Sequence, residues 1–222
     1  MKKGAIFDMD GLLFDTERLF RDGWVEMAKQ FGQVPNPDFP VAVAGTSGAG
    51  MRDVIHRYYP EVDTFAFQKG CYAYAARILE NGPPEKPGMR EILAFFREQG
   101  VKIAVASSSY REMIQKNLRV AGIEEFFDAV ISGDEVTRGK PEPDIFLLAA
   151  QRLGCAPEDC YVFEDGINGV RAGIAAGCAT VMIPDLFPPT DELRKGCAGI
   201  YSSLIEAEQA IRSYEEQNYG NK

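Results

Sequence analysis

The chain has 222 residues, of which 45% are hydrophobic and 26% are charged, and this composition is typical of a folded globular protein. Its formal net charge of −9 disfavours nonspecific attraction to nucleic acid or to an anionic membrane surface. The longest obvious apolar run, IFLLAA at residues 145–150, is far too short to span a membrane. We therefore expect a cytoplasmic protein that binds neither nucleic acid nor membrane.

The reactive side chains limit the chemistry further. The chain contains five cysteines without a CxxC pair or zinc-finger spacing, so we expect ordinary reduced thiols. It contains one histidine, His56, through which any Ser–His–Asp triad or histidine-rich zinc site would have to pass. Acid–base chemistry is therefore expected to depend mainly on carboxylates.

Short and largely continuous apolar runs predict strands that are buried on both faces of a parallel sheet. These runs occupy residues 4–7, 101–107, 127–132, 160–163 and 179–183. Helical patterns that each end at a glycine occupy residues 88–100, 110–122, 143–154 and 167–177. Strands that alternate with helices predict an α/β fold with a doubly wound parallel sheet.

Residues 18 to about 82 interrupt this alternation, because they contain three helix-like segments and no clear strand. The segment NGPPEKPG, residues 81–88, is rich in proline and glycine and is typical of a connection between structural units. We therefore predict a core domain made of residues 1–15 and 83–222. A helical domain of residues 16–82 is inserted into it.

Polar side chains follow three of the predicted strands. Asp8 and Asp10 follow the first strand, Ser107 to Ser109 end the second, and Glu164 and Asp165 end the fourth. Ligands of open α/β sheets bind beyond the carboxyl ends of the strands, so these groups are expected to share one crevice. Lys140, in the loop GKPEPD, is placed to reach them. Several buried carboxylates need a cation, and their oxygens suit Mg²⁺.

Four motifs in order resemble those of the haloacid dehalogenase-like hydrolases: DMDG followed by LLFDT, SSS, KPEPD, and VFEDGINGVRAGIAAG. The resemblance covers the whole chain, and the helical insertion lies where that family has its small α-helical cap. Within the family, the chain is most similar to the branch of beta-phosphoglucomutase-like proteins and small sugar-phosphate phosphatases. The resemblance implies a Rossmann-like core.

The resemblance also implies roles for individual residues. Asp8 would be the nucleophile that forms an aspartyl-phosphate, and Asp10 would be the general acid and then the general base. Ser107, Ser108 and Lys140 would hold the phosphoryl oxygens and offset their charge. The family's Mg²⁺ would be bound by the Asp8 carboxylate, the Asp10 backbone carbonyl and Asp165, with Glu164 as an indirect or alternate ligand.

The expected function is a Mg²⁺-dependent phosphatase acting on a small phosphorylated metabolite, either a sugar phosphate or a nucleotide. A dehalogenase of this fold would lack Asp10, and a non-catalytic binding protein would be expected to have lost one of the core motif residues. The main alternative is a beta-phosphoglucomutase-type mutase. Mutases of this branch have a cap histidine where this chain has Phe20. They also have an arginine after the glycine loop of the cap, whereas the loop AGTSGAG, residues 44–50, has no arginine before Arg52. Both differences weigh against a mutase.

Substrate specificity is expected to depend on the cap, around Phe20, Gly45 and Arg52. Cap residues vary without affecting the core chemistry, so the sequence does not name the substrate. We expect the protein to be a monomer or a weak homodimer.

Overall fold

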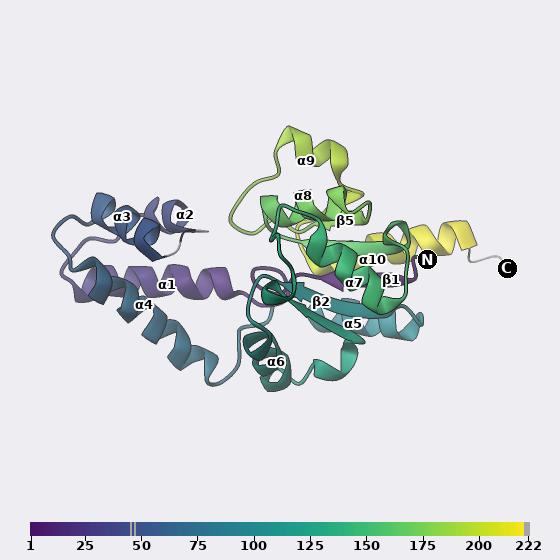
Figure 1. Ribbon diagram of the computed structural model, residues 1–222, viewed down its shortest axis with the longest axis horizontal. Helices are drawn as coiled ribbons and strands as arrows, with labels where there is room; N and C mark the ends of the chain where they lie inside the picture. The colour runs from purple at the N-terminus through teal and green to yellow at the C-terminus, as the bar shows by residue number, and fades with distance from the viewer. Residues whose placement is uncertain (45, 47, 220–222) are drawn as a thin grey trace. The chain divides into compact units, whose positions relative to one another are not determined.

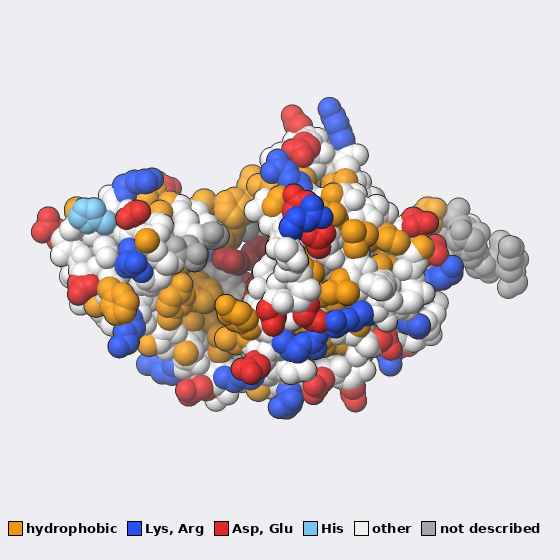
Figure 2. All heavy atoms as spheres, viewed as in Figure 1, with side chains coloured by type: hydrophobic (Ala, Val, Ile, Leu, Met, Phe, Trp, Pro, Cys, Tyr) orange, Lys and Arg blue, Asp and Glu red, His pale blue; other side chains and the backbone are white. Residues whose placement is uncertain are grey.

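The computed structural model describes residues 1–44, 46 and 48–219. The chain divides into two compact units (Figure 1). The first unit comprises Met1–Asp15 and Glu85–Lys222, and the second comprises Thr16–Pro84. No helix among the described residues is both long and apolar enough to cross a bilayer. On the face shown in Figure 2, acidic and basic side chains are intermixed.

The first unit is built on a six-stranded sheet with the order β3-β2-β1-β4-β5-β6, in which every neighbouring pair is parallel. The strands are β1 (Gly4–Phe7), β2 (Lys102–Ser107), β3 (Ala129–Ser132), β4 (Cys160–Glu164), β5 (Ala179–Met182) and β6 (Gly199–Ile200). This order is that of a doubly wound sheet, and it confirms the predicted fold class. Strand β6 was not predicted from the sequence, because two residues are too few to form an apolar run.

Helices cover both faces of the sheet, which explains why the central strands are apolar on both sides. Along β1, Ala5 and Phe7 contribute to one core and Ile6 contributes to the other. The core around Phe7 is covered by α5 (Met89–Glu98), α6 (Arg111–Val120) and α10 (Leu204–Tyr219). The core around Ile6 is covered by α7 (Asp144–Leu153) and α8 (Ile167–Ala175). Helix α9 (Asp191–Gly196) packs through Leu193 on β5 and α8.

The second unit is entirely helical in its described residues and has an aromatic core of its own. It contains α1 (Thr16–Gln30), α2 (Phe39–Val43), α3 (Gly48–Tyr58) and α4 (Thr64–Leu79). Phe67 of α4 lies at the centre, with ring centroids 6.0 Å from Trp24 and 5.3 Å from Tyr59. Asp63 caps α4, since its Oδ1 accepts hydrogen bonds from the backbone N–H groups of Phe65 and Ala66 at 3.0 Å.

The two chain segments that connect the units pair with each other. Phe14 and Glu85 form an antiparallel bridge, and the Lys86 N–H donates to the Leu13 carbonyl at 2.9 Å. These backbone hydrogen bonds lie within the first unit. The chain therefore leaves and re-enters the first unit at neighbouring positions.

Candidate active site

The polar residues singled out in the sequence lie at the carboxyl ends of β1, β2 and β4. The strand order reverses between β1 and β4, and ligand crevices of doubly wound sheets form at such a point. The Asp8 N–H donates to the Phe163 carbonyl at 3.0 Å, which continues the pairing of β1 with β4 by one residue. Asp8 is thereby held beside the residues that end β4.

Lys140 bridges two of these strand ends. Its Nζ lies 2.5 Å from Asp8 Oδ1 and 2.6 Å from Glu164 Oε1, and it also donates to the Ala106 carbonyl at 3.3 Å. The ring centroid of Phe146 lies 5.0 Å from the same nitrogen. Only 9% of the Lys140 side chain is exposed. Burial lowers the pKa of Lys140, but the charges of Asp8 and Glu164 outweigh burial and raise it, so the lysine is a fixed cation.

Three carboxylates form an acidic cluster around this cation. One oxygen each of Asp8, Glu164 and Asp165 lies within 4.8 Å of the other two. Burial, followed by repulsion from the neighbouring carboxylates, raises the pKa of Asp165 well above its usual value. Burial is also the main cause that raises the pKa of Asp8, despite the opposing effect of Lys140. When all three carboxylates are ionised, Lys140 offsets only one of their three negative charges, so the cluster suits a divalent cation with oxygen ligands.

The Glu164 carboxylate is held at both of its oxygens. Oε1 accepts from Lys140, and Oε2 accepts from the N–H groups of Asp165 at 3.0 Å and Gly166 at 3.2 Å, where α8 begins. A side chain at Gly169 would put its Cβ 1.7 Å from Glu164 Oε1. Gly169, which lacks a side chain, therefore makes room for the Glu164 carboxylate.

A second glycine permits the close approach of the turn after β1 to the Asp165 side chain. Gly11 has a φ of +85°, which favours glycine, and a Cβ built there would lie 2.3 Å from Asp165 Oδ2. The turn after β1 therefore packs directly against the Asp165 carboxylate. This contact explains the glycine that follows the two aspartates in DMDG.

The Asp10 carboxylate lies beside the hydroxyl groups of the serines at the end of β2. Its Oδ2 accepts hydrogen bonds from Ser109 Oγ at 2.9 Å and from Ser107 Oγ at 3.4 Å. Ser107 Oγ also accepts from the Ser109 N–H at 3.1 Å. Ser107 and Ser108 were the serines predicted to bind phosphate, but Ser108 is exposed, and Ser109 is the closer partner of Asp10. The third position of SSS was the signal for Ser109.

The expected specificity residues belong to the second unit. Phe20 is half-buried on α1 and packs edge-on against Tyr72, with ring centroids 6.0 Å apart. Arg52 Nη1 on α3 lies 3.4 Å from Gln68 Oε1 on α4. Gly45 lies outside the described residues.

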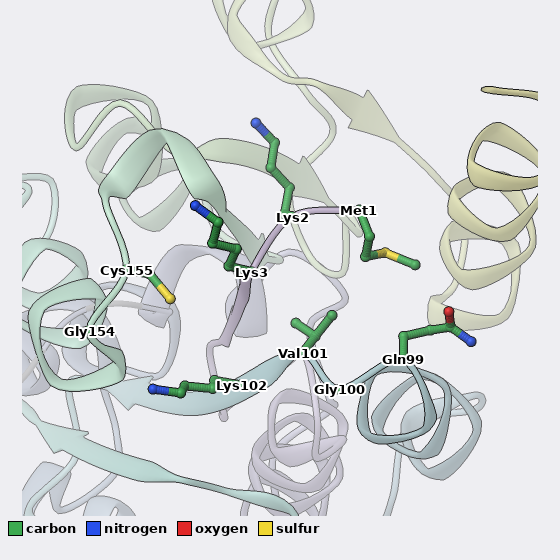
Figure 3. A pocket seen from close by; sticks show the side chains of 9 residues that line it. All are labelled: Met1, Lys2, Lys3, Gln99, Gly100, Val101, Lys102, Gly154 and Cys155. Carbon is green, nitrogen blue, oxygen red and sulfur yellow. The ribbon is translucent and has the colours of Figure 1, made fainter. Parts of the chain in front are cut away.

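A pocket of about 390 Å³ lies at the opposite end of the strands, where β1 and β2 begin (Figure 3). Three lysines line it, but each already has an acceptor. Lys3 Nζ lies 2.7 Å from Asp159 Oδ2, Lys102 donates to the Leu153 carbonyl at 2.8 Å, and Lys2 donates to the Glu158 carbonyl at 2.5 Å. The lysines of this pocket therefore stabilise neighbouring loops.

Known proteins resemble the chain in sequence and in structure. A phosphorylated carbohydrates phosphatase from Thermotoga maritima is 33% identical over 176 residues, which cover 79% of this chain and 82% of that relative. A T. maritima protein given the provisional name beta-phosphoglucomutase has a TM-score of 0.80 at 28% identity, covering 95% of this chain and 99% of that one. A hydrolase from Deinococcus radiodurans R1, crystallised with phosphate and sodium, has a TM-score of 0.82 at 27% identity, with 96% of each chain covered.

These likenesses agree with the branch that the motifs indicated. A model of the haloacid dehalogenase-like hydrolases matches residues 2–177, which include the β1 aspartates, the serines of β2, Lys140 and the β4 carboxylates. The chain therefore belongs to the haloacid dehalogenase-like hydrolases and is an enzyme.

Proposed function

We propose that the chain is a Mg²⁺-dependent phosphatase that hydrolyses a small phosphorylated metabolite through an aspartyl-phosphate on Asp8. The observation that carries the proposal is the pairing of buried Asp8 with Lys140 inside a cluster of three carboxylates. The phosphatase relative described above acts on phosphorylated carbohydrates, which favours a sugar phosphate as the substrate.

In the first step, an Asp8 oxygen attacks phosphorus and the bond to the substrate's alcohol oxygen breaks. Lys140 keeps Asp8 in place and offsets negative charge on the phosphoryl group. The Ser107 hydroxyl at the end of β2 donates a hydrogen bond to a phosphoryl oxygen. Asp10 gives its proton to the departing alcohol. Since Oδ2 of Asp10 accepts from Ser109 and Ser107, we assign the transferable proton to Oδ1.

In the second step, water attacks the phosphorus of the aspartyl-phosphate and Asp10 takes up the proton of that water. Inorganic phosphate leaves, and the Asp8 carboxylate and the protonated Asp10 are restored. The same side chain serves as acid and base because it remains beside the reacting oxygen in both steps.

The residues present fit Mg²⁺, because the cluster offers hard carboxylate oxygens and carries more negative charge than Lys140 offsets. Asp8 and Asp165 would hold the ion together with the Asp10 backbone carbonyl. Glu164, whose oxygens are taken by Lys140 and by backbone N–H groups, would position the lysine and Asp165 instead. When bound, the ion would supply electrostatic stabilisation of the phosphoryl group in the transition state.

The nucleophile is tested by Asp8→Asn, which should remove more than about 99% of phosphate release, because an amide does not attack phosphorus at a useful rate. Asp159→Asn, at the opposite end of the sheet, is the control and should retain activity. Phosphate release is measured on a panel of sugar phosphates, nucleotides and phosphorylated acids.

The metal is tested by its removal: activity should vanish in excess chelator and return with Mg²⁺. Full activity of Asp8→Asn, or in chelator, would contradict the proposal.

The mutase alternative is favoured by the provisional name of one structural neighbour. It is disfavoured by Phe20, whose ring cannot exchange protons. Incubation with beta-glucose 1-phosphate and a trace of the 1,6-bisphosphate separates the two activities. Rapid formation of glucose 6-phosphate with little inorganic phosphate would establish the mutase and leave the roles of the core residues unchanged.

A further inference from the structure

One carboxylate outside the acidic cluster has an oxygen without a partner. Asp185 follows β5 in the loop that leads toward α9, and its Oδ2 is buried without a hydrogen-bond partner. Among the described residues, Thr16 Oγ1 is the other buried side-chain oxygen in this condition. A buried carboxylate oxygen without a partner is costly and indicates a water molecule or an ion beside it.

The backbone places Asp185 next to the end of β4. The Ile183 N–H donates to the Glu164 carbonyl at 2.8 Å, so β5 continues alongside β4 up to the acidic cluster. Asp185 comes two residues later, in the loop that follows the carboxyl end of β5. Asp185 therefore lies on the same side of the sheet as the cluster, but it does not belong to the three carboxylates whose oxygens lie within 4.8 Å of one another in the described part of the chain.

Lys86 holds the other oxygen of Asp185. Its Nζ lies 2.9 Å from Asp185 Oδ1 and 3.3 Å from Asp15 Oδ1. The backbone of Lys86 is itself fixed by its hydrogen bond to the Leu13 carbonyl. The lysine therefore fixes Oδ1, whereas Oδ2 is left to bind a hydrogen-bond donor.

We propose that Asp185 is a positioning residue for the metal site, in which Oδ2 accepts a hydrogen bond from a water ligand of the Mg²⁺ ion and Lys86 fixes the carboxylate. The inference rests on the proposed function, because it requires the ion. Mg²⁺ usually keeps several water ligands, and residues that orient such ligands contribute strongly to affinity. A donor from the ion's hydration shell would satisfy the buried oxygen and would explain why an aspartate stands at this position.

The test compares Asp185→Asn with Asp15→Asn by calorimetric titration of the metal-free protein with Mg²⁺ alone. The two variants are matched, because each removes one carboxylate from Lys86 and the side chains are 21% and 20% exposed. Asp185→Asn should raise the Mg²⁺ dissociation constant about tenfold or more, the loss typical of a removed outer partner. Asp15→Asn should change it less than about threefold. Thermal unfolding without metal verifies that each variant is folded.

The inference is overturned if Asp185→Asn binds Mg²⁺ as the wild type does, or if Asp15→Asn weakens binding equally. A wild-type protein that binds no Mg²⁺ would overturn the proposed metal site as well, which distinguishes the failure of the proposed function from that of the inference alone.

Discussion

At the scale of single residues, the site depends on the space left by a glycine, Gly169, as well as on its charged side chains. Glu164 is 2% exposed and its Oε1 occupies the space beside Gly169. The carboxylate contacts Lys140 and the start of α8, so displacing it would disturb the partner of Asp8 as well. The absence of a side chain at Gly169 therefore determines where Glu164, and through it Lys140, can lie.

We predict that Gly169→Ala lowers phosphate release more than about tenfold, because the new methyl group displaces Glu164 and with it Lys140. The variant should also lose about 1–3 kcal/mol of unfolding free energy, the usual range for overpacking. Gly166→Ala is the control, since its Cβ would come no closer than 3.9 Å to Glu164. Phosphate release and urea denaturation measure both effects. Equal behaviour of the two variants would show that space at Gly169 is not limiting.

At the scale of elements, the edge strand β3 is covered by two arginines. Arg111 on α6 and Arg152 on α7 donate to the Val130 carbonyl at 2.8 Å and 3.3 Å, and both pair with Glu135. Glu135 also accepts from the Ser132 N–H at 3.0 Å. A carbonyl on the open side of β3 is thereby satisfied by side chains, which reduces the tendency of an edge strand to pair with another chain.

We predict that Glu135→Gln lowers the unfolding free energy by about 1–2 kcal/mol at neutral pH, because both arginines lose their ionic partner. Burial, which raises the pKa of Glu135, is outweighed by the Ser132 N–H and the two arginines, which lower it to about 2. The stabilisation by Glu135 is therefore complete at pH values above the ordinary pKa of a glutamate, and it is lost as the pH falls toward 2. Denaturant titrations near pH 7 and pH 3 measure this.

The matched control is Glu142→Gln, whose ion pair with Arg138 is exposed, with side chains 49% and 61% accessible. Its effect should stay within about 0.5 kcal/mol. An effect of Glu135→Gln no larger than this would mean that the arginines do not depend on the carboxylate.

At the scale of the whole molecule, we propose that the two compact units are separate domains. Each has its own hydrophobic core, and the chain's one tryptophan, Trp24, lies in the core of the helical unit. Its ring stacks on Phe67. Tryptophan fluorescence therefore reports on the helical unit, whereas circular dichroism reports on both.

We predict that Phe67→Ala lowers the stability of the helical unit by about 3–5 kcal/mol, the usual cost of removing a buried phenylalanine. The fluorescence transition in denaturant should shift to lower concentration, and part of the circular dichroism change should remain at the wild-type midpoint. Phe65→Ala, on the same helix but 64% exposed, is the control and should leave both transitions unchanged. Coincident shifts of both signals would show that the units unfold as one.

We also predict that Mg²⁺ stabilises the protein more at about pH 8 than at about pH 5.5. The pKa values of Asp8 and Asp165 are raised chiefly by burial, so the metal-free folded chain binds more protons than the unfolded chain. Its stability therefore falls as the pH rises through the raised values. Mg²⁺ requires the ionised carboxylates, so its effect grows over the same range. Thermal unfolding with and without Mg²⁺ measures it, with Asp165→Asn as the control. An increase that is independent of pH would contradict the prediction.

The sequence by itself determined the five main strands, the residues at the strand ends and four of the covering helices, α5 to α8; it did not predict α9 or α10. These features are local: an apolar run of a few residues predicts a buried strand, and a glycine ends a helix within one turn. Strand ends of a parallel sheet share one edge, so Asp8, Lys140 and Glu164 were expected to meet although they lie far apart in the chain. Branch membership also followed, because four ordered motifs rarely occur together by chance.

Only the tertiary structure decided which side chains contact each other at that edge. It selected Ser109 as the closest serine to Asp10, gave Lys140 two carboxylate partners, and placed Gly169 against Glu164. It also brought Asp185 and Lys86 together beside the site. The physical reason is that such pairs depend on strand order and on the path of each loop. These are set by the packing of the whole core, which no local pattern of residues records.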